Sequence, residues 1–352
     1  MQNTTPPTIP TSPGLTKRRV GRFYLTSELG KGSNGAVFLG HDPVIDRDVA
    51  IKTLSLTSTP GLAEKKQREQ QFINEARAAG RLSHPNIVTI YDASSEGGTT
   101  FIAMEFLQGQ DLREALASGR RFESLETANI VSKVAGALAY AHENGVIHRD
   151  IKPANIFILP NNQPKVVDFG IARAPNRILS DQANPEQTLF NNNILGTPNY
   201  MSPEQALGQQ VTAATDVYSL GAVMYEMLTQ QKPFQGQNID KLLQQIAHKT
   251  PKFPSELSSN IPVALSNIVM KAMQKDPADR YASAAEMGEA LDKFLERDKR
   301  LKRKRGRPSD SLATDIQEQA PERGTLFWLS CAAVVVAVLA VTANFWLKIV
   351  PH

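Results

Sequence analysis

Residues 146–158 of the chain read VIHRDIKPANIFI, and this short stretch decides how the rest of the sequence is interpreted. The apolar, β-branched residues at both ends are typical of buried strands, where an unpaired charge is costly. The centre nevertheless carries basic side chains, a carboxylate and an amide: His148, Arg149, Asp150, Lys152 and Asn155. A polar hairpin turn would explain this centre. A loop that presents a carboxylate and an amide to a substrate and a metal would explain it equally well.

The composition is that of a globular protein. The chain has 352 residues, 41% hydrophobic and 21% charged, enough for one large or two ordinary domains. Eight Lys or Arg residues and one acid fall between Arg297 and Arg307, so the formal net charge of +4 describes a local patch. The single cysteine, Cys331, excludes an intramolecular disulfide and argues against a cysteine-based zinc site.

The two ends of the sequence differ from the rest. Residues 1–21 are rich in Thr and Pro and lack an apolar h-region, which favours a disordered leader over a secretory signal. Residues 324–347 carry no formal charge, and as a helix they would span roughly 36 Å against a hydrocarbon core of about 30 Å. Trp328 and Trp346 lie near the ends of this segment, as interfacial anchors do. We therefore expect one C-terminal transmembrane helix, rather than a buried core helix, and a short external tail at 348–352.

The hydrophobic periodicity divides the remainder of the chain. Within residues 23–107, short β-branched and aromatic runs indicate strands, and a helical repeat at 64–82 interrupts them. The following segments are mainly helical, and the first long helix ends at Gly145, a residue typical of helix C-termini. The pattern predicts an α+β fold over residues 22–296, with a small sheet-rich N-terminal lobe and a larger helical C-terminal lobe. A basic juxtamembrane linker follows at 297–323.

A glycine-rich motif lies between two of the predicted strands. Gly30, Gly32 and Gly35 form G-x-G-x-x-G, and glycines let the backbone approach phosphate groups and offer them N–H donors. The dinucleotide-binding version of this motif opens a helix. Here the next element is a strand, which favours a cover over a mononucleotide. An ordinary glycine-rich hairpin is the alternative.

A lysine and an acid form the next candidate pair. Lys52 ends the apolar strand VAIK, where a lysine is usually a snorkelling edge residue. Glu75, however, falls on the apolar face of its predicted helix, and an isolated buried carboxylate is strongly disfavoured. Lys52 is therefore the candidate partner of Glu75, and Glu69 is the competing acid.

Asp168 follows an apolar strand and precedes Phe169-Gly170. A tight turn capped by an acid would explain this sequence. Mg²⁺, however, binds proteins through one or two carboxylates plus phosphate oxygens, which makes Asp168 a candidate metal ligand. Asn155 would be the second ligand. Asp150 would then orient an incoming hydroxyl and accept its proton.

Taken in order, these motifs match the signature of the protein kinases: a Gly-rich loop, V-A-I-K, H-R-D-x-x-x-x-N, D-F-G and a P-E element at Pro203-Glu204. From about Phe23 to Phe294 the chain resembles the eukaryotic-like (Hanks-type) Ser/Thr protein kinases of bacteria. Its departures are Ile151 for the commoner Leu and Ser202 for Ala. The resemblance implies the two-lobed protein kinase fold and transfer of the ATP γ-phosphate to Ser or Thr hydroxyls of proteins, including the kinase itself.

The resemblance also implies the roles of individual residues. Lys52, placed by Glu75, would bind the α- and β-phosphates, Asp150 would align the acceptor hydroxyl, and Lys152 would steady the γ-phosphate. ATP with Mg²⁺, or with Mn²⁺ in its place, is the implied cofactor. Apart from Lys52, the implied nucleotide-binding residues are Gly30, Lys31, Gly32, Ser33, Gly35, Val37, Ala50, Glu105, Leu107 and, at the ribose, Asp111.

Two further contacts follow from the same resemblance. Asp216 would brace the catalytic loop, and Arg280 would pair with Glu204.

A membrane-tethered pseudokinase is the competing function. It would be favoured if the catalytic residues were replaced, and all of them are present.

A polar stretch between Gly170 and Gly196 is longer than most structureless loops and favours a mobile activation segment. Arg149, beside the catalytic acid, needs an anion to offset its charge, and a phosphate on Ser180 or Thr188 would supply nearly two negative charges. We favour Thr188 and interpret Thr197 as a structural hydroxyl near the catalytic loop. The alternative is that Arg149 packs only against backbone carbonyls.

The basic run before the predicted span indicates its orientation. The positive-inside rule predicts a single-pass protein of the cell (inner) membrane with its kinase lobes in the cytoplasm. Anionic lipids are expected partners of the basic run, at about 1 kcal/mol for each residue near the surface. The RGRP sequence at 305–308 also resembles an AT-hook, a minor-groove arginine arm, but its place before the span favours lipid over DNA. Because few residues follow the span, we expect no external sensor domain and regulation by internal signals, by a homodimer or by the span.

Overall fold

The computed structural model describes residues 18–32, 35–54, 62–169 and 198–305. Residues 1–297 form one compact unit, and of the second unit, 298–352, only the end of the last helix is described. The elements of the first sheet and its helix are β1 (Arg19–Val20), β2 (Phe23–Gly32), β3 (Gly35–Asp42), β4 (Arg47–Thr53), α1 (Leu62–Ala79), β5 (Ile90–Glu96) and β6 (Thr99–Glu105). The later elements are β7 (Gln110–Asp111), α2 (Leu112–Ala117), α3 (Ser124–Glu143), β8 (Ile156–Leu159), β9 (Gln163–Val166), α5 (Pro203–Ala206), α6 (Ala213–Thr229), α7 (Ile239–His248), α8 (Pro254–Leu257), α9 (Val263–Ala272) and α10 (Ala284–Arg305).

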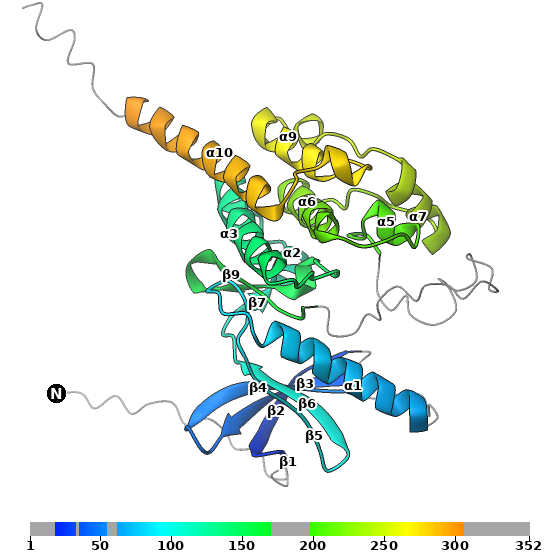
Figure 1. Ribbon diagram of the computed structural model, residues 1–352. Coiled ribbons are helices and arrows are strands. Elements are labelled where there is room, and N and C mark those ends of the chain that lie inside the picture. The colour runs from blue at the N-terminus through cyan, green and yellow to red at the C-terminus, as the bar shows by residue number, and fades with distance from the viewer. Residues whose placement is uncertain (1–17, 33–34, 55–61, 170–197, 306–352) are drawn as a thin grey trace, which may run out of the picture. The chain divides into compact units, whose positions relative to one another are not determined.

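The N-terminal elements form a curled, six-stranded antiparallel sheet in the order β1-β2-β3-β4-β6-β5, with α1 lying along it (Figure 1). Neighbouring residues of a strand point to opposite faces, so Phe101 and Ile102 of β6 enter different apolar clusters. Ile102 packs with Phe72 and Ala76 of α1. Phe101 meets Phe23 edge to face, with 5.9 Å between the ring centroids. This alternation explains why one strand serves two cores.

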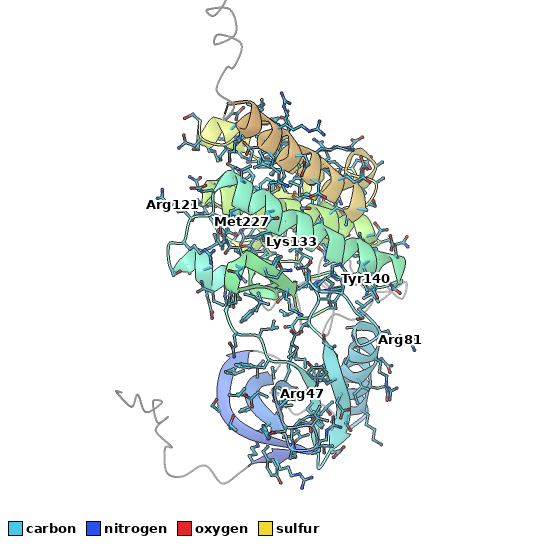
Figure 2. The ribbon with its side chains drawn as sticks, turned by 90° about the vertical axis from the view of Figure 1, so that its left-hand side faces the viewer. Arg47, Arg81, Arg121, Lys133, Tyr140 and Met227 are labelled. Atoms are coloured by element: carbon cyan, nitrogen blue, oxygen red, sulfur yellow. The ribbon has the colours of Figure 1, made fainter. Side chains whose placement is uncertain are left out.

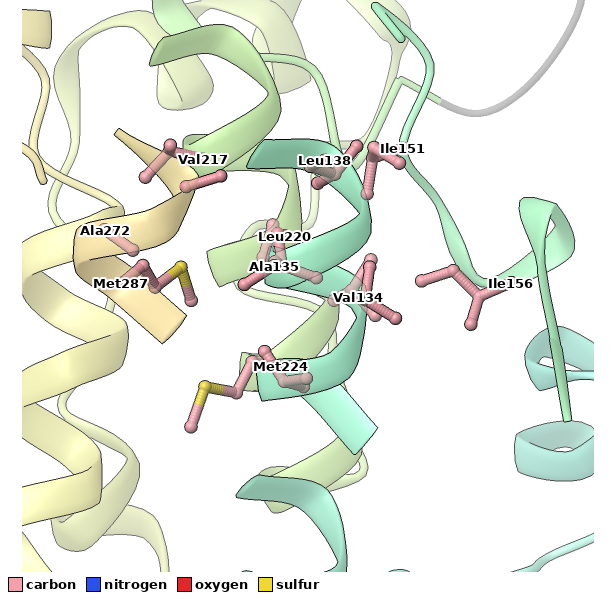
Figure 3. Packing of buried hydrophobic residues seen from close by; sticks show 14 of the residues in the cluster. Val134, Ala135, Leu138, Ile151, Ile156, Val217, Leu220, Met224, Ala272 and Met287 are labelled. Carbon is pink, nitrogen blue, oxygen red and sulfur yellow. The ribbon is translucent and has the colours of Figure 1, made fainter. Parts of the chain in front are cut away.

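Helix α6 is the centre of the helical part. Every residue from Thr215 to Tyr225 is buried, which is the pattern of a helix covered on all sides. Val134 and Leu138 of α3 lie beside Leu220 and Met224 of α6 in the same core (Figure 3). Because α6 is held on all sides, a functional side chain at its N-terminus is fixed in position.

A small three-stranded sheet, in the order β7-β8-β9, joins the two parts of the compact unit. Gly109 precedes β7 with a φ of +156°, and a Cβ atom there would lie 2.3 Å from the carbonyl oxygen of Ile158. Only glycine allows this approach of two backbones. The tight contact fixes where the chain passes from the large sheet to the small one.

The sequence predicted the long elements and missed several short ones. The helix predicted at 64–82 is α1, and the helix ending before Gly145 is α3. Residues 146–147 are not a strand, because the N–H of Val146 bonds to the carbonyl oxygen of Ala141 in α3 at 2.9 Å instead of joining a sheet. Helices α2, α5 and α8 were not predicted. No helix among the described residues has the length and apolar character to cross a membrane, and the span predicted at 324–347 lies outside them.

Candidate active site

The fully buried carboxylate of Asp216, in the first turn of α6, holds the loop that follows α3. Its Oδ2 accepts the backbone N–H of His148 at 2.8 Å, and its Oδ1 accepts that of Arg149 at 2.8 Å. Nε2 of His142 lies 2.7 Å from the same Oδ2. A buried charge persists only when it is hydrogen-bonded. The predicted bracing of the catalytic loop by Asp216 is therefore confirmed.

Two non-glycine residues of the site have left-handed backbones. The φ angles are +66° at Arg149 and +60° at Asp168. This region disfavours side chains by about 1–2 kcal/mol per residue, and such strain persists where the surroundings over-determine it. At Arg149 the N–H is held by Asp216, and the carbonyl oxygen accepts from Nε2 of Gln205 at 2.8 Å. The backbone that presents Asp150 is thus fixed from both sides.

The structure brings two of the predicted residues, Lys152 and Asn155, together around Asp150. Nζ of Lys152 lies 2.7 Å from Oδ2 of Asp150. Nδ2 of Asn155 donates to the Asp150 carbonyl oxygen at 2.8 Å and approaches Oδ2 at 3.3 Å. The short 3₁₀ turn Pro153–Asn155 folds the chain back so that residues five apart can meet. Both contacts use the Nδ2 group of Asn155, so its role as a metal ligand through the amide oxygen stays a prediction.

Lys52 and Asp168 form the second charged group of the site. Nζ of Lys52 lies 2.7 Å from Oδ1 of Asp168, and both side chains are partly exposed. Burial raises the pKa of Asp168, but the charge and hydrogen bond of Lys52 outweigh it and hold that pKa below its usual value. Asp168 is therefore ionised at neutral pH, as a metal ligand must be.

His148 connects these two groups, a role that the sequence analysis did not assign. Its Nδ1 accepts the N–H of Asp150 at 3.2 Å, and its Nε2 donates to the carbonyl oxygen of Val167 at 3.0 Å. The imidazole also packs on the ring of Phe169 at a centroid distance of 4.7 Å. The signal in the sequence was a histidine within an apolar run, where its two ring nitrogens require partners.

An apolar cluster adjoins this charged region. Ala50, Val88 and Met104 form a buried cluster, against which Val37 and Leu107 pack. Three residues predicted to contact the nucleotide therefore share one cluster, from β3, β4 and the segment after β6. Apolar walls with nearby backbone donors and acceptors are what a planar base needs. In the glycine-rich hairpin, Gly30 pairs with Val37, Lys31 with Ala36 and Gly32 with Gly35.

Asp111 has a structural role in addition to the one predicted at the ribose. It is the N-cap of α2, where its Oδ1 accepts the N–H of Glu114 at 2.8 Å. Its Oδ2 pairs with Arg113 at 2.9 Å. A ribose hydroxyl would have to share this carboxylate with both partners, so the ribose contact stays a prediction.

Several predicted site residues lie outside the part that the structure describes. For Glu75 the backbone belongs to α1 and the side chain is not described, so its pairing with Lys52 stays a prediction. Ser33 of the glycine-rich loop and the proposed activation residues Ser180, Thr188 and Thr197 also lie outside it.

The predicted pair of Glu204 and Arg280 is confirmed. The guanidinium is bidentate, with Nη1 2.8 Å from Oε1 and Nη2 2.7 Å from Oε2, and both side chains are buried. The hydroxyl of Thr215 also donates to Oε1 at 2.7 Å. Burial raises the pKa of Glu204, but the hydrogen bonds from Arg280 and Thr215 outweigh it and leave that pKa below its usual value.

The matched family model, the protein kinase domain, covers residues 23–291. The chain is 40% identical over 270 residues to serine/threonine-protein kinase PknB of Mycobacterium leprae, which is 76% of this chain and 42% of the relative. It is 37% identical over 272 residues to PrkC of Bacillus subtilis, 77% of this chain and 40% of the relative. The chain therefore spans about two fifths of the length of these relatives.

The fold combines a curled antiparallel sheet with a helical part, and charged groups lie between them. The chain belongs to the protein kinase family, and the relatives that it matches are bacterial serine/threonine-protein kinases.

Replacing Glu204 with Gln should destabilise the protein by about 3 kcal/mol or more at pH 7, since removing one partner of a buried pair leaves a buried charge uncompensated. Because the pKa of Glu204 is lowered on folding, its stabilising contribution is complete above the ordinary value of 4.5 and is lost as the pH falls through the folded-state pKa. The difference between wild type and Glu204→Gln should therefore shrink in acid. Urea denaturation at pH 7 and pH 4 measures it.

The matched control is Glu289→Gln, because Glu289 forms an exposed pair with Lys293 at 3.3 Å. This variant should change stability by less than about 1 kcal/mol. Equal losses in the two variants would contradict a special role for the buried pair.

Proposed function

We propose that this protein is a Ser/Thr protein kinase that transfers the γ-phosphoryl group of ATP to hydroxyls of proteins, including its own. One observation carries the proposal. A carboxylate at Asp150, flanked by Lys152 and Asn155, lies in a loop whose histidine contacts Val167, the residue before Asp168. Phosphoryl transfer needs this combination, because it depends on positioning and charge neutralisation and requires little covalent chemistry.

The donor set fits a magnesium ion bound together with nucleotide phosphates. Asp168 would supply a carboxylate and Asn155 an amide oxygen, and Mg²⁺ usually takes one or two carboxylates plus phosphate oxygens. Within the described ranges, no cluster of three or more His, Cys, Asp or Glu could hold a metal alone. When bound, the ion would neutralise charge on the transferring phosphoryl group, with Mn²⁺ as an alternative. Asp168 and Asn155 would orient it.

The chain's own residues would do the remaining work. Asp150 would accept a hydrogen bond from the substrate hydroxyl and align it for attack. Lys152, now 2.7 Å from Asp150, would move toward the γ-phosphate as charge develops there. Lys52 would exchange its contact with Asp168 for the α- and β-phosphates.

A groove beside Asp150 suits a protein substrate. It has a volume of about 540 Å³ and contains both charged and apolar side chains. Its lining includes Arg113, Asp150, Lys152, Pro198, Tyr200, Met201, Glu226 and Lys232. An open groove that passes the catalytic carboxylate can accept an extended peptide with its hydroxyl at Asp150. This supports a protein, and not a small metabolite, as the phosphate acceptor.

Replacing Asp168 with Asn should lower phosphate transfer by about 10³-fold or more, because a preorganised charge at the reacting group is lost. Asn keeps the size of the side chain and tolerates the left-handed backbone. The measurement is ³²P transfer from Mg·ATP to a general protein substrate and to the kinase itself.

The matched control is Asp46→Asn. Asp46 also has a positive φ of 49°, but 96% of its side chain is exposed in the β3–β4 turn. This variant should keep near-normal activity. Near-normal activity in Asp168→Asn would refute the assignment of Asp168 and favour a binding module without catalysis.

We further propose activation by phosphorylation of the segment between Gly170 and Gly196, with Thr188 favoured over Ser180. Arg149, next to the catalytic acid, is a suitable partner for the phosphate.

Thr188→Ala should lower activity about tenfold or more, since a charge-assisted hydrogen bond contributes about 1.5–3 kcal/mol. Mass spectrometry of the wild type, Ser180→Ala, Thr188→Ala and the double variant locates the phosphate. A double variant without phosphate in this segment but with full activity would exclude the mechanism.

Finally, we propose a single-pass anchor at 324–347 in the cell membrane, with the kinase domain in the cytoplasm. The support is the uncharged length of the segment and the basic run on its N-terminal side, which would bind anionic lipid. Protease added outside intact cells should leave the kinase domain whole, while permeabilised cells should lose it. Digestion of the kinase domain in intact cells would contradict the orientation.

A further inference from the structure

A partly buried ion pair connects the end of β6 to β9. Nζ of Lys165 lies 2.7 Å from Oε2 of Glu105, with 13% and 27% of the respective side chains exposed. Lys165 also donates to the carbonyl oxygen of Ile87 at 3.4 Å. The same Glu105 oxygen accepts the N–H of Thr89 at 3.3 Å. Because the pair is largely shielded from water, salt screens it less than it screens an exposed pair.

The pair closes a ring of backbone contacts between three segments. Val166 of β9 donates its N–H to Asn86 at 2.8 Å and accepts from Val88 at 3.0 Å. Glu105 donates its backbone N–H to Thr89 at 2.9 Å. Residues 86–89 are therefore bonded to β9 on one side and to the end of β6 on the other. The Lys165–Glu105 pair adds the direct connection between those two strands.

The ammonium group of Lys165 lies in this junction, because it contacts both the Glu105 carboxylate and the carbonyl oxygen of Ile87. Burial lowers the pKa of His84, and the nearby charge of Lys165 lowers it further. His84 also accepts the N–H of Asn86 through Nδ1 at 3.1 Å, so it stays a neutral acceptor inside the same junction.

The two members of the pair belong to segments that would meet opposite ends of a bound nucleotide. Glu105 is the first residue of the segment whose backbone would meet the adenine. Lys165 precedes the proposed metal ligand Asp168 by three positions, and the intervening Val167 is bonded through its N–H to the carbonyl oxygen of Asn155 at 2.9 Å. At most three residues therefore separate each member of the pair from a residue proposed to contact the nucleotide or its metal.

We infer that Lys165 is a positioning residue that, through Glu105, sets the distance between the adenine-binding segment and the metal-binding carboxylate. The inference rests on the proposed ATP-dependent function. Without the pair, the adenine segment would populate positions in which its distance from the metal-binding carboxylate does not fit one bound nucleotide. Apparent nucleotide affinity then falls by the fraction of molecules in the matching position. The catalytic loop would be unaffected, because Asp216 holds it independently.

The experiment compares Lys165→Met with Lys133→Met in the full-length chain. Lys133, on α3 (Figure 2), is the matched control, because its Nζ donates to Gln163 of the same strand β9 at 2.9 Å and has no contact with Glu105. We expect Lys165→Met to raise the KM for ATP and the Kd for Mg·ADP about fivefold or more, with kcat within about twofold. Lys133→Met should leave all three quantities within about twofold of wild type.

Two further variants separate positioning from general stability. Glu105→Gln, which keeps the shape of the side chain, should weaken Mg·ADP binding in the same way as Lys165→Met. The reversed pair, Glu105→Lys with Lys165→Glu, should recover at least half of the lost binding free energy. If the pair contributes only to stability, its variants should lower Tm without raising the KM for ATP relative to kcat.

The inference is overturned if Lys165→Met, or Glu105→Gln where the lysine variant does not fold, binds Mg·ADP as tightly as wild type. It is also overturned if Lys133→Met weakens binding equally or if the reversed pair restores nothing. Binding of Mg·ADP by a wild-type protein that transfers no phosphate would refute the proposed function and still leave the positioning effect measurable.

Discussion

The buried carboxylate of Asp216 is the constraint on which the rest of the site depends. It is desolvated and must receive hydrogen bonds, and the donors that reach it are backbone N–H groups of His148 and Arg149. Those bonds hold Arg149 in a left-handed conformation that an arginine would otherwise avoid. The carboxylate of Asp150 and the imidazole of His148 take their positions from that turn. The packed helix α6 thus determines the direction of side chains far from its own core.

The charged pairs of this protein fall into two kinds. Glu204 and Arg280 are buried, bidentate and shared with Thr215, so separating them would strand a charge in the interior. Lys52–Asp168 and Lys152–Asp150 are partly exposed ion pairs, of a kind that contributes little net stability. A lysine in such a pair can leave its carboxylate for a phosphate group at small cost. The Glu204–Arg280 pair and the two lysine pairs therefore differ in burial, although the N–O distance is 2.7 Å in each.

The sequence indicated candidate site residues but few of the contacts between them. Asp150, Asn155 and Asp168 could be selected because each conflicts with its apolar surroundings. The contact of Lys52 with Asp168 was not predicted, because period and spacing place residues on strand and helix faces and do not show which distant segments meet. The same limit applies to Lys165: on a half-buried strand it is an ordinary edge residue, and only the folded chain brings it to Glu105. Short helices such as α5 escape periodicity because four residues make one turn.

Strand β9 and the residues after it are held from two independent sides. On one side, Asn86 and Val88 bond the backbone of Val166. On the other, His148 and Asn155 bond the carbonyl and the N–H of Val167. Val166 and Val167 therefore cannot shift together without breaking one of these two sets of hydrogen bonds. Asp168 immediately follows them, so its left-handed backbone is a consequence of this double anchoring: the chain has to turn sharply where the regular bonding ends, and an aspartate tolerates that turn better than most side chains.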